Sequence, residues 1–270
     1  MSRADNFVAL DLTQCATDVL AAQDEKPPRL ISSPFLDVAI ADSYVLQQRV
    51  AELRIARGER PIGYKVGCTS PRIQAQVGIQ TPIWGRLFAQ HELSHPATVE
   101  LRHFAGLAIE GELAVRLAVD PRDLPSSSQA LEKVIQNVQP VIELHHFAIP
   151  RAQLQASVLI ANNAVHAGFV VADESVPLCE LQEPLTISLD GKQVAEVLPQ
   201  ELRHIILNSL AWLRCELPKN SSRPSPATRA TVLCGSAAEV FPIAKATQIE
   251  VSLGGLAPIC CNVNDKLQVA

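Results

Sequence analysis

The chain has 270 residues, of which 47% are apolar, 19% charged and 4% aromatic, as in globular proteins large enough to bury a core. Its 23 basic and 28 acidic side chains give a formal net charge of −5, so no excess of positive charge is available to hold a nucleic-acid backbone. The sequence contains no apolar run of the roughly 20 residues that a membrane-spanning helix needs, and its first residues lack a signal-peptide pattern. We therefore expect a cytoplasmic protein with no nucleic-acid or membrane partner.

The N-terminal part of the chain is predicted to be helical. Apolar residues recur at helical intervals from Asn6 to about Gln23, and the stretch KPPRLISSP then forms a loop. A second helix is predicted from Asp37 to about Arg57, with Gly58 after its basic end. Residues 1–60 are expected to form a helical subdomain, and residues 61–270 the main body.

After Pro61 the pattern changes to short apolar segments separated by Gly, Pro and Ser, which indicates a strand-rich body. Two helices are predicted within it, from Ser126 to Val138 and from Gln200 to Cys215. The stretch from Pro218 to Ala230 lacks apolar periodicity and is predicted to be a surface loop. The predicted strands lie in GYKVGC, GRLF, GLAIEGELAVRLAV, PVIELHHFAI, HAGFVVA, PLTISLDG, TVLCG, IEVSLGG and ICCNV.

The seven cysteines are scattered, without a CxxC pair or a Cys/His spacing suited to zinc. They are expected to be reduced thiols of the core. Cys68 stands close to Lys65 in the sequence, and it is the one cysteine to examine for reactivity.

Two glutamates interrupt an apolar strand pattern in GLAIEGELAVRLAV. Alternate residues of a strand face the same side, so Glu110 and Glu112 are expected to point together, with Ala108 and Ala114 on their face. Two carboxylates on one apolar face repel each other and lose hydration, which raises their pKa unless a cation offsets their charge. The opposite face would carry Ile109, Leu113 and Val115.

A third glutamate, Glu143, lies in a similar pattern, QPVIELHHFAI, with Val141 and His145 on its own face. Three carboxylates with no thiolate nearby suit Mg²⁺ or Mn²⁺, with water or substrate in the remaining positions. The alternative is that Glu110 and Glu112 lie on the solvent face of an edge strand and that Glu143 is unrelated to them. Spacing alone leaves both interpretations open.

Several ordered segments resemble one enzyme family. The stretch GERPIGYKVGCTSPRIQAQVGIQTPIWGRLF is similar to the GxKxGLTS, QxQxG and GxLF signature of 2-keto-4-pentenoate hydratases, in the fumarylacetoacetate hydrolase superfamily. The resemblance runs from about Asp37 to the C-terminus and continues through IEGELAVRL, PVIEL, IANNAVHAGFVV, LNSLAWL, VLCGSA and VSLGGL.

The resemblance implies an α+β fold, a mixed β-roll or barrel with flanking helices and an N-terminal helical cap. It implies that Mg²⁺ or Mn²⁺ is held by Glu110, Glu112 and Glu143. Lys65 matches the family's lysine and is expected to neutralise charge and transfer protons, with a pKa that this setting can lower. Ser236 matches the serine of a TGS-like turn, where it would bind the substrate carboxylate or simply stabilise the turn. The resemblance also makes a homo-oligomer plausible.

The chemistry that the resemblance implies is that of a 2-oxo acid. Its carboxylate and 2-oxygen chelate a divalent ion, which stabilises negative charge that develops on the oxygen. A 2-hydroxy-2,4-dienoate would take up a proton at C5 and water at C4 to give a 4-hydroxy-2-oxo acid. The same stabilisation would serve loss of carbon dioxide from a related 2-oxo acid.

Two departures from the family pattern bear on the acid and base groups. Ile83 stands where hydratases often carry an acidic residue that activates water or donates a proton. Where many relatives have a DNAS-like run, this chain has Asn162, Asn163 and His166. We expect His145 and His166 to supply the missing acid and base functions, and the two asparagines to position substrate or to stabilise a turn.

Three functions therefore remain to be compared. The first is a metal-dependent hydratase of 2-hydroxy-2,4-dienoates, and the second is a decarboxylase or tautomerase on the same scaffold, which Ile83 favours. The third is a non-catalytic subunit of a lyase complex, against which the intact carboxylates and Lys65 argue.

Overall fold

The computed structural model describes residues 11–31, 38–150, 153–217, 230–236 and 238–265. Two helices begin this part of the chain, α1 (Leu12–Asp24) and α2 (Ile40–Ala56). The carboxylate of Asp11 accepts hydrogen bonds from the backbone N–H groups of Thr13 and Gln14, which fixes the start of α1. Both predicted helices are confirmed within the described residues, whereas the predicted loop from Pro218 to Ala230 lies almost wholly outside them.

The larger sheet of the described residues has eight strands in the order β2-β1-β10-β5-β6-β7-β3, with β11 paired to β5. It is mixed, because β1 runs parallel to β10 while β5 runs antiparallel to both β10 and β6. Its strands are β1 (Pro61–Gly67), β2 (Ile83–Phe88), β3 (Glu92–Ser94), β5 (Leu107–Leu117), β6 (Ile135–His146), β7 (His166–Val171), β10 (Thr231–Leu233) and β11 (Phe241–Pro242).

A second sheet, of five strands among the described residues, has the order β4-β13-β12-β8-β9. It packs against β5, where a Cβ atom placed on Gly111 would come within 2.6 Å of Ile187 and 3.0 Å of Val251. Only a glycine lets the two sheets approach this closely. The strands are β4 (Ala97–Glu100), β8 (Leu185–Leu189), β9 (Lys192–Val197), β12 (Thr247–Leu253) and β13 (Ile259–Asn264).

The two faces of β5 divide as the alternation predicts. Ile109, Leu113 and Val115 are fully or almost fully buried in the main core, which they share with the second sheet and with α6. Ala114 on the opposite face packs in a separate cluster with Val141. The carboxylate-bearing face is therefore the face of the large sheet turned away from the second sheet.

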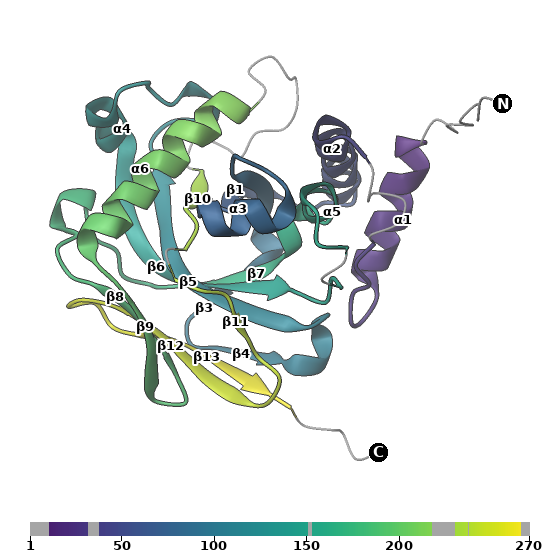
Figure 1. Cartoon of the computed structure of the whole chain (residues 1–270). Helices are drawn as coiled ribbons and strands as arrows, with labels where there is room; N and C mark the ends of the chain where they lie inside the picture. The colour runs from purple at the N-terminus through teal and green to yellow at the C-terminus, as the bar shows by residue number, and fades with distance from the viewer. Residues whose placement is uncertain (1–10, 32–37, 151–152, 218–229, 237, 266–270) are drawn as a thin grey trace.

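Four more helices flank the sheets. These are α3 (Pro71–Val77), α4 (Ser128–Val134), α5 (Ala156–Ala161) and α6 (Pro199–Glu216). Figure 1 shows α4 and α6 on one side of the molecule and α1, α2 and α5 together on another. Short 3₁₀ turns connect the elements: η2 (Ala89–His91), η3 (Leu101–His103), η4 (Pro121–Asp123), η6 (Asn163–Val165) and η7 (Leu178–Glu180).

The helix predictions for the main body are partly correct. The prediction of a helix from Gln200 to Cys215 is confirmed by α6. The prediction of a helix from Ser126 to Val138 is wrong in its last turn, because Ile135 begins strand β6 and pairs with Leu117. The short helices α3 and α5 were not predicted, since neither is long enough to show a helical period.

The N-terminal helices share a core with the rest of the chain. Ala16 and Val19 of α1, with Leu46 and Val50 of α2, pack against Val158 and its neighbours in α5. The division at residue 60 coincides with the gap between α2 and β1, and it stays a prediction. In the part of the chain that the structure describes, no helix combines the length and the apolar character required to cross a membrane.

Candidate active site

The strand register brings the predicted carboxylates together. In the pairing of β5 with β6, Glu110 lies opposite Glu143, and Ala108 lies opposite His145. Glu112 and Glu143 are 1% and 0% exposed, and β5 lies between β10 and β6. The alternative of an edge strand with solvent-facing carboxylates is therefore wrong.

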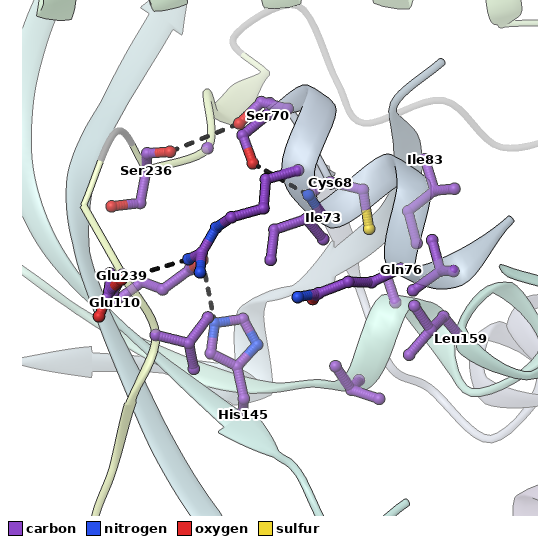
Figure 2. A pocket seen from close by; sticks show the side chains of 18 of the residues that line it. Cys68, Ser70, Ile73, Gln76, Ile83, Glu110, His145, Leu159, Ser236 and Glu239 are labelled. Atoms are coloured by element: carbon purple, nitrogen blue, oxygen red, sulfur yellow. Dashed lines mark hydrogen bonds and ion pairs between the residues drawn. The ribbon is translucent and has the colours of Figure 1, made fainter. Parts of the chain in front are cut away.

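Glu110, Glu143 and His145 form the tightest group. His145 Nε2 lies 3.3 Å from Glu110 Oε2 and 3.5 Å from Glu143 Oε2. One ligand atom from each of the three residues falls within 4.8 Å of the others, a separation that one metal ion can bridge. Figure 2 shows Glu110 and His145 side by side at one end of a cavity.

Glu143 is held by a lysine and a histidine from two other strands. Its Oε1 atom lies 3.3 Å from Lys65 Nζ of β1 and 2.7 Å from His166 Nδ1 of β7. Burial raises the pKa of Glu143, but Lys65, His145 and His166 outweigh that effect and hold the pKa well below its usual range. This carboxylate is therefore ionised, although it is completely buried.

The pKa of Glu112 is shifted in the opposite direction to that of Glu143. Burial, followed by the charge of Glu143, raises the pKa of Glu112 well above its usual range. Its Oε2 atom accepts a hydrogen bond of 2.5 Å from the backbone N–H of Gly235, and its buried Oε1 atom has no hydrogen-bond partner. The cluster therefore holds more carboxylate than its own cations can neutralise.

Position 235 requires a glycine, because Thr69 and the backbone of Val66 lie close to its Cα atom. Its φ is +83°, and a Cβ atom there would lie 2.7 Å from Thr69 Cγ2 and 2.9 Å from the carbonyl oxygen of Val66. The next residue, Ser236, donates its hydroxyl to the carbonyl of Gly111 at 3.1 Å and accepts from the backbone N–H of Ala238 at 3.0 Å. The Ser236 hydroxyl thus stabilises the turn, and Ser236 also lines the cavity.

Lys65 is buried at the same end of the cavity, with 3% of its surface exposed. Burial lowers the pKa of Lys65, but Glu143, Glu110 and Glu112 together raise it above the usual value. The three carboxylates that surround the ammonium thus favour its charged form. The expected lowering of the pKa concerns a metal-bound substrate beside Lys65, and it stays a prediction.

The cavity has a volume of about 560 Å³ and opens beside α3. One face of α3 lines it with Arg72, Ile73, Gln76 and Val77, and Ser70 caps that helix by accepting from the backbone N–H of Ile73. Cys68 also lines the cavity, but burial raises the pKa of its thiol to about 11, so it is not a thiolate. The sequence pointed to none of the four α3 residues, although the QxQxG match covers Gln76 and Val77.

Three predicted site residues do not line the cavity. The Asn162 amide binds the backbone of Ile31 in both directions, at 3.3 and 2.8 Å, and the Asn163 amide binds Arg86 in the same way, at 2.7 and 2.9 Å. The His166 side chain has no exposed surface and contacts Glu143. The two asparagine amides thus bind backbone groups and His166 contacts Glu143, and the substrate-binding and catalytic roles expected of these three residues stay predictions.

The cavity wall includes His145 and Ile83. His145 lines the cavity, whereas the neighbouring His146 is not among the lining residues and its Nδ1 accepts from the backbone N–H of Ala105 at 3.3 Å. Ile83 also lines the cavity, with 3% of its surface exposed. The position at which hydratases often carry an acid is therefore an apolar part of this wall.

Comparisons with known proteins identify relatives over most of the chain. A 2-keto-4-pentenoate hydratase of Dechloromonas aromatica is 26% identical over 229 residues, which cover 82% of this chain and 86% of that protein. A 4-oxalocrotonate decarboxylase of a Pseudomonas species is 28% identical over 158 residues, which cover 58% of this chain and 61% of that protein. No protein-family model matches the chain.

The fold is that of a solved enzyme structure. A 4-oxalocrotonate decarboxylase from Pseudomonas putida G7, complexed with magnesium and adipate, superposes with a TM-score of 0.82 at 22% identity. The match covers 93% of this chain and 97% of that one. The expected fold, mixed β-sheets with flanking helices and N-terminal helices, is thus confirmed.

Proposed function

We propose that the chain belongs to the 2-keto-4-pentenoate hydratase family, in the fumarylacetoacetate hydrolase superfamily, and that it is a metal-dependent hydro-lyase. It adds water to a 2-hydroxy-2,4-dienoate and yields a 4-hydroxy-2-oxo acid. The observation that carries this proposal is the buried cluster of Glu110, Glu112 and Glu143 beside Lys65, at one end of a cavity large enough for such a substrate.

The cluster fits a divalent cation. Among the described residues, Glu112 Oε1 is buried without a hydrogen-bond partner, and buried polar atoms of this kind are rare unless something else binds them. Glu143 Oε2 and His145 Nε2 are buried as well and lie 3.5 Å apart. Oxygen donors with no thiolate suit Mg²⁺ or Mn²⁺, and the proposed ligands are Glu110, Glu112 and Glu143. When bound, the ion supplies Lewis-acid stabilisation of negative charge on the 2-oxygen.

The protein's own groups serve the proton transfers. The reaction balances with one water: the C2 hydroxyl loses its proton as the ketone forms, protons enter at C5 and C3, and the water oxygen bonds to C4. The buried ammonium of Lys65 stabilises the charge that develops on the 2-oxygen. His145 lines the cavity and its Nε2 atom lies 3.3 Å from Glu110 Oε2, so we assign to it the proton transfer at carbon. His166 orients Glu143.

A decarboxylase is the second candidate. Ile83 favours it, since the cavity carries an apolar side chain where hydratases often have an acid, and the related decarboxylase of the Pseudomonas species supports it. A non-catalytic subunit is the weakest candidate, because a scaffold has no use for three buried carboxylates around a lysine.

The test follows the ultraviolet absorbance of 2-hydroxypenta-2,4-dienoate with the protein, Mg²⁺ or Mn²⁺, and then EDTA. The expected result is metal-dependent loss of the dienol and a product heavier by one water in the mass spectrum. Release of carbon dioxide from a related 2-oxo dicarboxylate, with no hydration, would assign the decarboxylase. Absence of both turnover and metal binding would contradict both enzymes.

We also propose that the protein is a homo-oligomer that acts on a small molecule, which its family membership supports. Light scattering of the purified protein measures its mass directly. A mass equal to one chain would contradict this proposal.

A further inference from the structure

The cavity has two chemically different ends. Figure 2 shows Glu110, His145 and Ser236 at one end and Ile83 and Leu159 at the other. The first end carries the carboxylate cluster and Lys65. The side chains of the second end are buried and apolar: Val77, Ile83, Leu159, Ala164 and Val165, with exposures of 5%, 3%, 5%, 2% and 7%.

The apolar end is part of a packed core. Its five side chains belong to one buried cluster, which also includes Ala156 and Ile160 of α5. Such a cluster has little freedom to rearrange around a charged group, because packed interiors lose contacts when side chains move. The shape and the apolar character of this end are therefore fixed before a ligand binds.

A strained turn holds part of this wall. Asn163, Ala164 and Val165 have φ values of 54°, 52° and 54°, in the left-handed region that residues with a Cβ atom rarely adopt. The Asn163 amide keeps the turn in place by binding both backbone groups of Arg86. A Cβ atom on the adjacent Gly85 would lie 2.7 Å from the Asn163 carbonyl oxygen, so β2 and the turn are in close contact. The strain presents Ala164 and Val165 to the cavity.

The apolar end offers no positive charge to a ligand. Among the described residues that line the cavity, the cationic side chains are Lys65, which faces the carboxylates, and Arg72. The Arg72 side chain is 65% exposed and lies 3.3 Å from Glu239, itself 73% exposed. The nearby polar groups, the Cys68 thiol and the exposed Gln76 amide, are neutral. A carboxylate placed at this end would lose its hydration without gaining a counter-charge.

We propose that the apolar end binds the substrate tail, and that the tail is an uncharged alkyl chain extending from C5 of the dienoate. This inference rests on the proposed function, because that function places the carboxylate and the 2-oxygen of the substrate at the carboxylate cluster. It names the substrate class, alkyl-substituted 2-hydroxy-2,4-dienoates, and it excludes substrates with a second carboxylate at the far end.

The size of the expected selectivity follows from transfer free energies. Each tail methylene that enters the apolar end should raise kcat/KM about fourfold. A carboxylate at the same position should lower kcat/KM about 100-fold relative to a methyl group, since it would be buried without a partner.

The experiment uses the full chain with Mg²⁺ and measures two quantities. The first is kcat/KM for 2-hydroxydienoates whose C5 carries hydrogen, methyl, ethyl or carboxylate. The second is the Kd of unreactive saturated 2-oxo acids, 2-oxohexanoate and 2-oxoadipate, measured by calorimetry. We expect a higher kcat/KM for the alkyl dienoates than for the dicarboxylate, and a lower Kd for 2-oxohexanoate than for 2-oxoadipate. Tighter binding of 2-oxoadipate than of 2-oxohexanoate would overturn the inference.

Two variants locate the selectivity at this end of the cavity. Ile83→Ala should reduce the preference for ethyl over hydrogen at least fourfold, and Ile83→Arg should reverse the order of the two 2-oxo acids. Val194→Ala, an exposed position on β9, is the matched control and should keep the order of the parent chain. An unchanged order in Ile83→Arg would contradict the assignment of the tail to this end.

The two measurements separate this inference from the function on which it rests. Preference for 2-oxohexanoate without turnover of any dienoate would retain the tail site and refute the hydratase. Turnover with a preference for the dicarboxylates would retain the enzyme and refute the tail site. Absence of turnover of every dienoate together with absence of binding of both 2-oxo acids would refute both.

Discussion

Replacing Glu112 by glutamine tests the metal site without removing its shape. The substitution keeps the side-chain volume and an oxygen that can accept from the backbone N–H of Gly235. It removes an ionisable carboxyl group from a cluster in which burial, followed by the charges of Glu143 and Glu110, raises the pKa of Glu112. In EDTA we therefore expect Glu112→Gln to be at least as stable as the parent protein.

The same change should abolish most of the stabilisation by metal. A metal at about 100 times its Kd adds about 2.7 kcal/mol to the free energy of unfolding, which for a chain of this length raises the Tm by about 5 °C. If Glu112→Gln weakens metal binding about 100-fold, the same concentration adds only about 0.4 kcal/mol and moves the Tm by less than about 1 °C. Metal-dependent turnover should be lost with the binding.

The assay is thermal unfolding of both proteins in EDTA and in Mg²⁺ or Mn²⁺. Glu239→Gln provides a matched control, because Glu239 is a cavity carboxylate that is 73% exposed and pairs with Arg72 outside the cluster. It should keep the full rise in Tm. A rise of about 5 °C in Glu112→Gln would refute the assignment of Glu112 as a ligand, and with it the reasoning from its unpartnered oxygen.

Three further predictions concern other buried groups. Lys65→Met should lower kcat at least about 100-fold, because the variant removes the buried positive charge. Metal should still raise the Tm of this variant. Unchanged kinetics would exclude a catalytic role for Lys65. Burial lowers the pKa of His91 to about 3, so the stability that neutral His91 contributes is present above pH 6.5 and is lost as the pH falls toward 3. At pH 5 the loss in free energy of unfolding, measured by denaturant unfolding, should reach about 2 kcal/mol in the parent protein and be absent from His91→Gln. Parallel dependences of stability on pH in the two proteins would contradict this prediction. Gly235→Ala should lower the free energy of unfolding by about 2–4 kcal/mol. Gly58 also has a positive φ but open space around it, so Gly58→Ala should lower the free energy of unfolding by only about 1 kcal/mol. Equal losses in the two variants would show that the contacts at Gly235 do not matter.

The parts of the site that depend on local periodicity could be predicted from the amino-acid sequence. Alternate residues of a strand share a face, so the common orientation of Glu110 and Glu112 followed from the strand pattern alone. The placement of His145 on the face of Glu143 followed in the same way, and the cavity confirms it. The helix α6 was predictable because its 18 residues span several turns of one apolar stripe.

Which of these groups lie in contact depends on strand pairing in the folded chain. The pairing of Glu110 with Glu143 depends on the register of β5 against β6, and a shift by one residue would turn one carboxylate to the opposite face. The sequence therefore left Glu110 and Glu112 open to an edge-strand interpretation, which the burial of β5 between two strands excludes. The role of His166 was also undetermined, since β7 sets its 2.7 Å contact with Glu143.

The character of the substrate cavity was likewise beyond local reasoning. Its apolar end gathers Ile83 from β2, Leu159 from α5 and Val165 from a left-handed turn, and these segments are far apart in the sequence. The raised pKa of Lys65 depends in the same way on carboxylates from two other strands. Short-range patterns specify which face a side chain occupies, but contacts between distant segments set the charge and the shape of a site, because strand register and packing are properties of the whole fold.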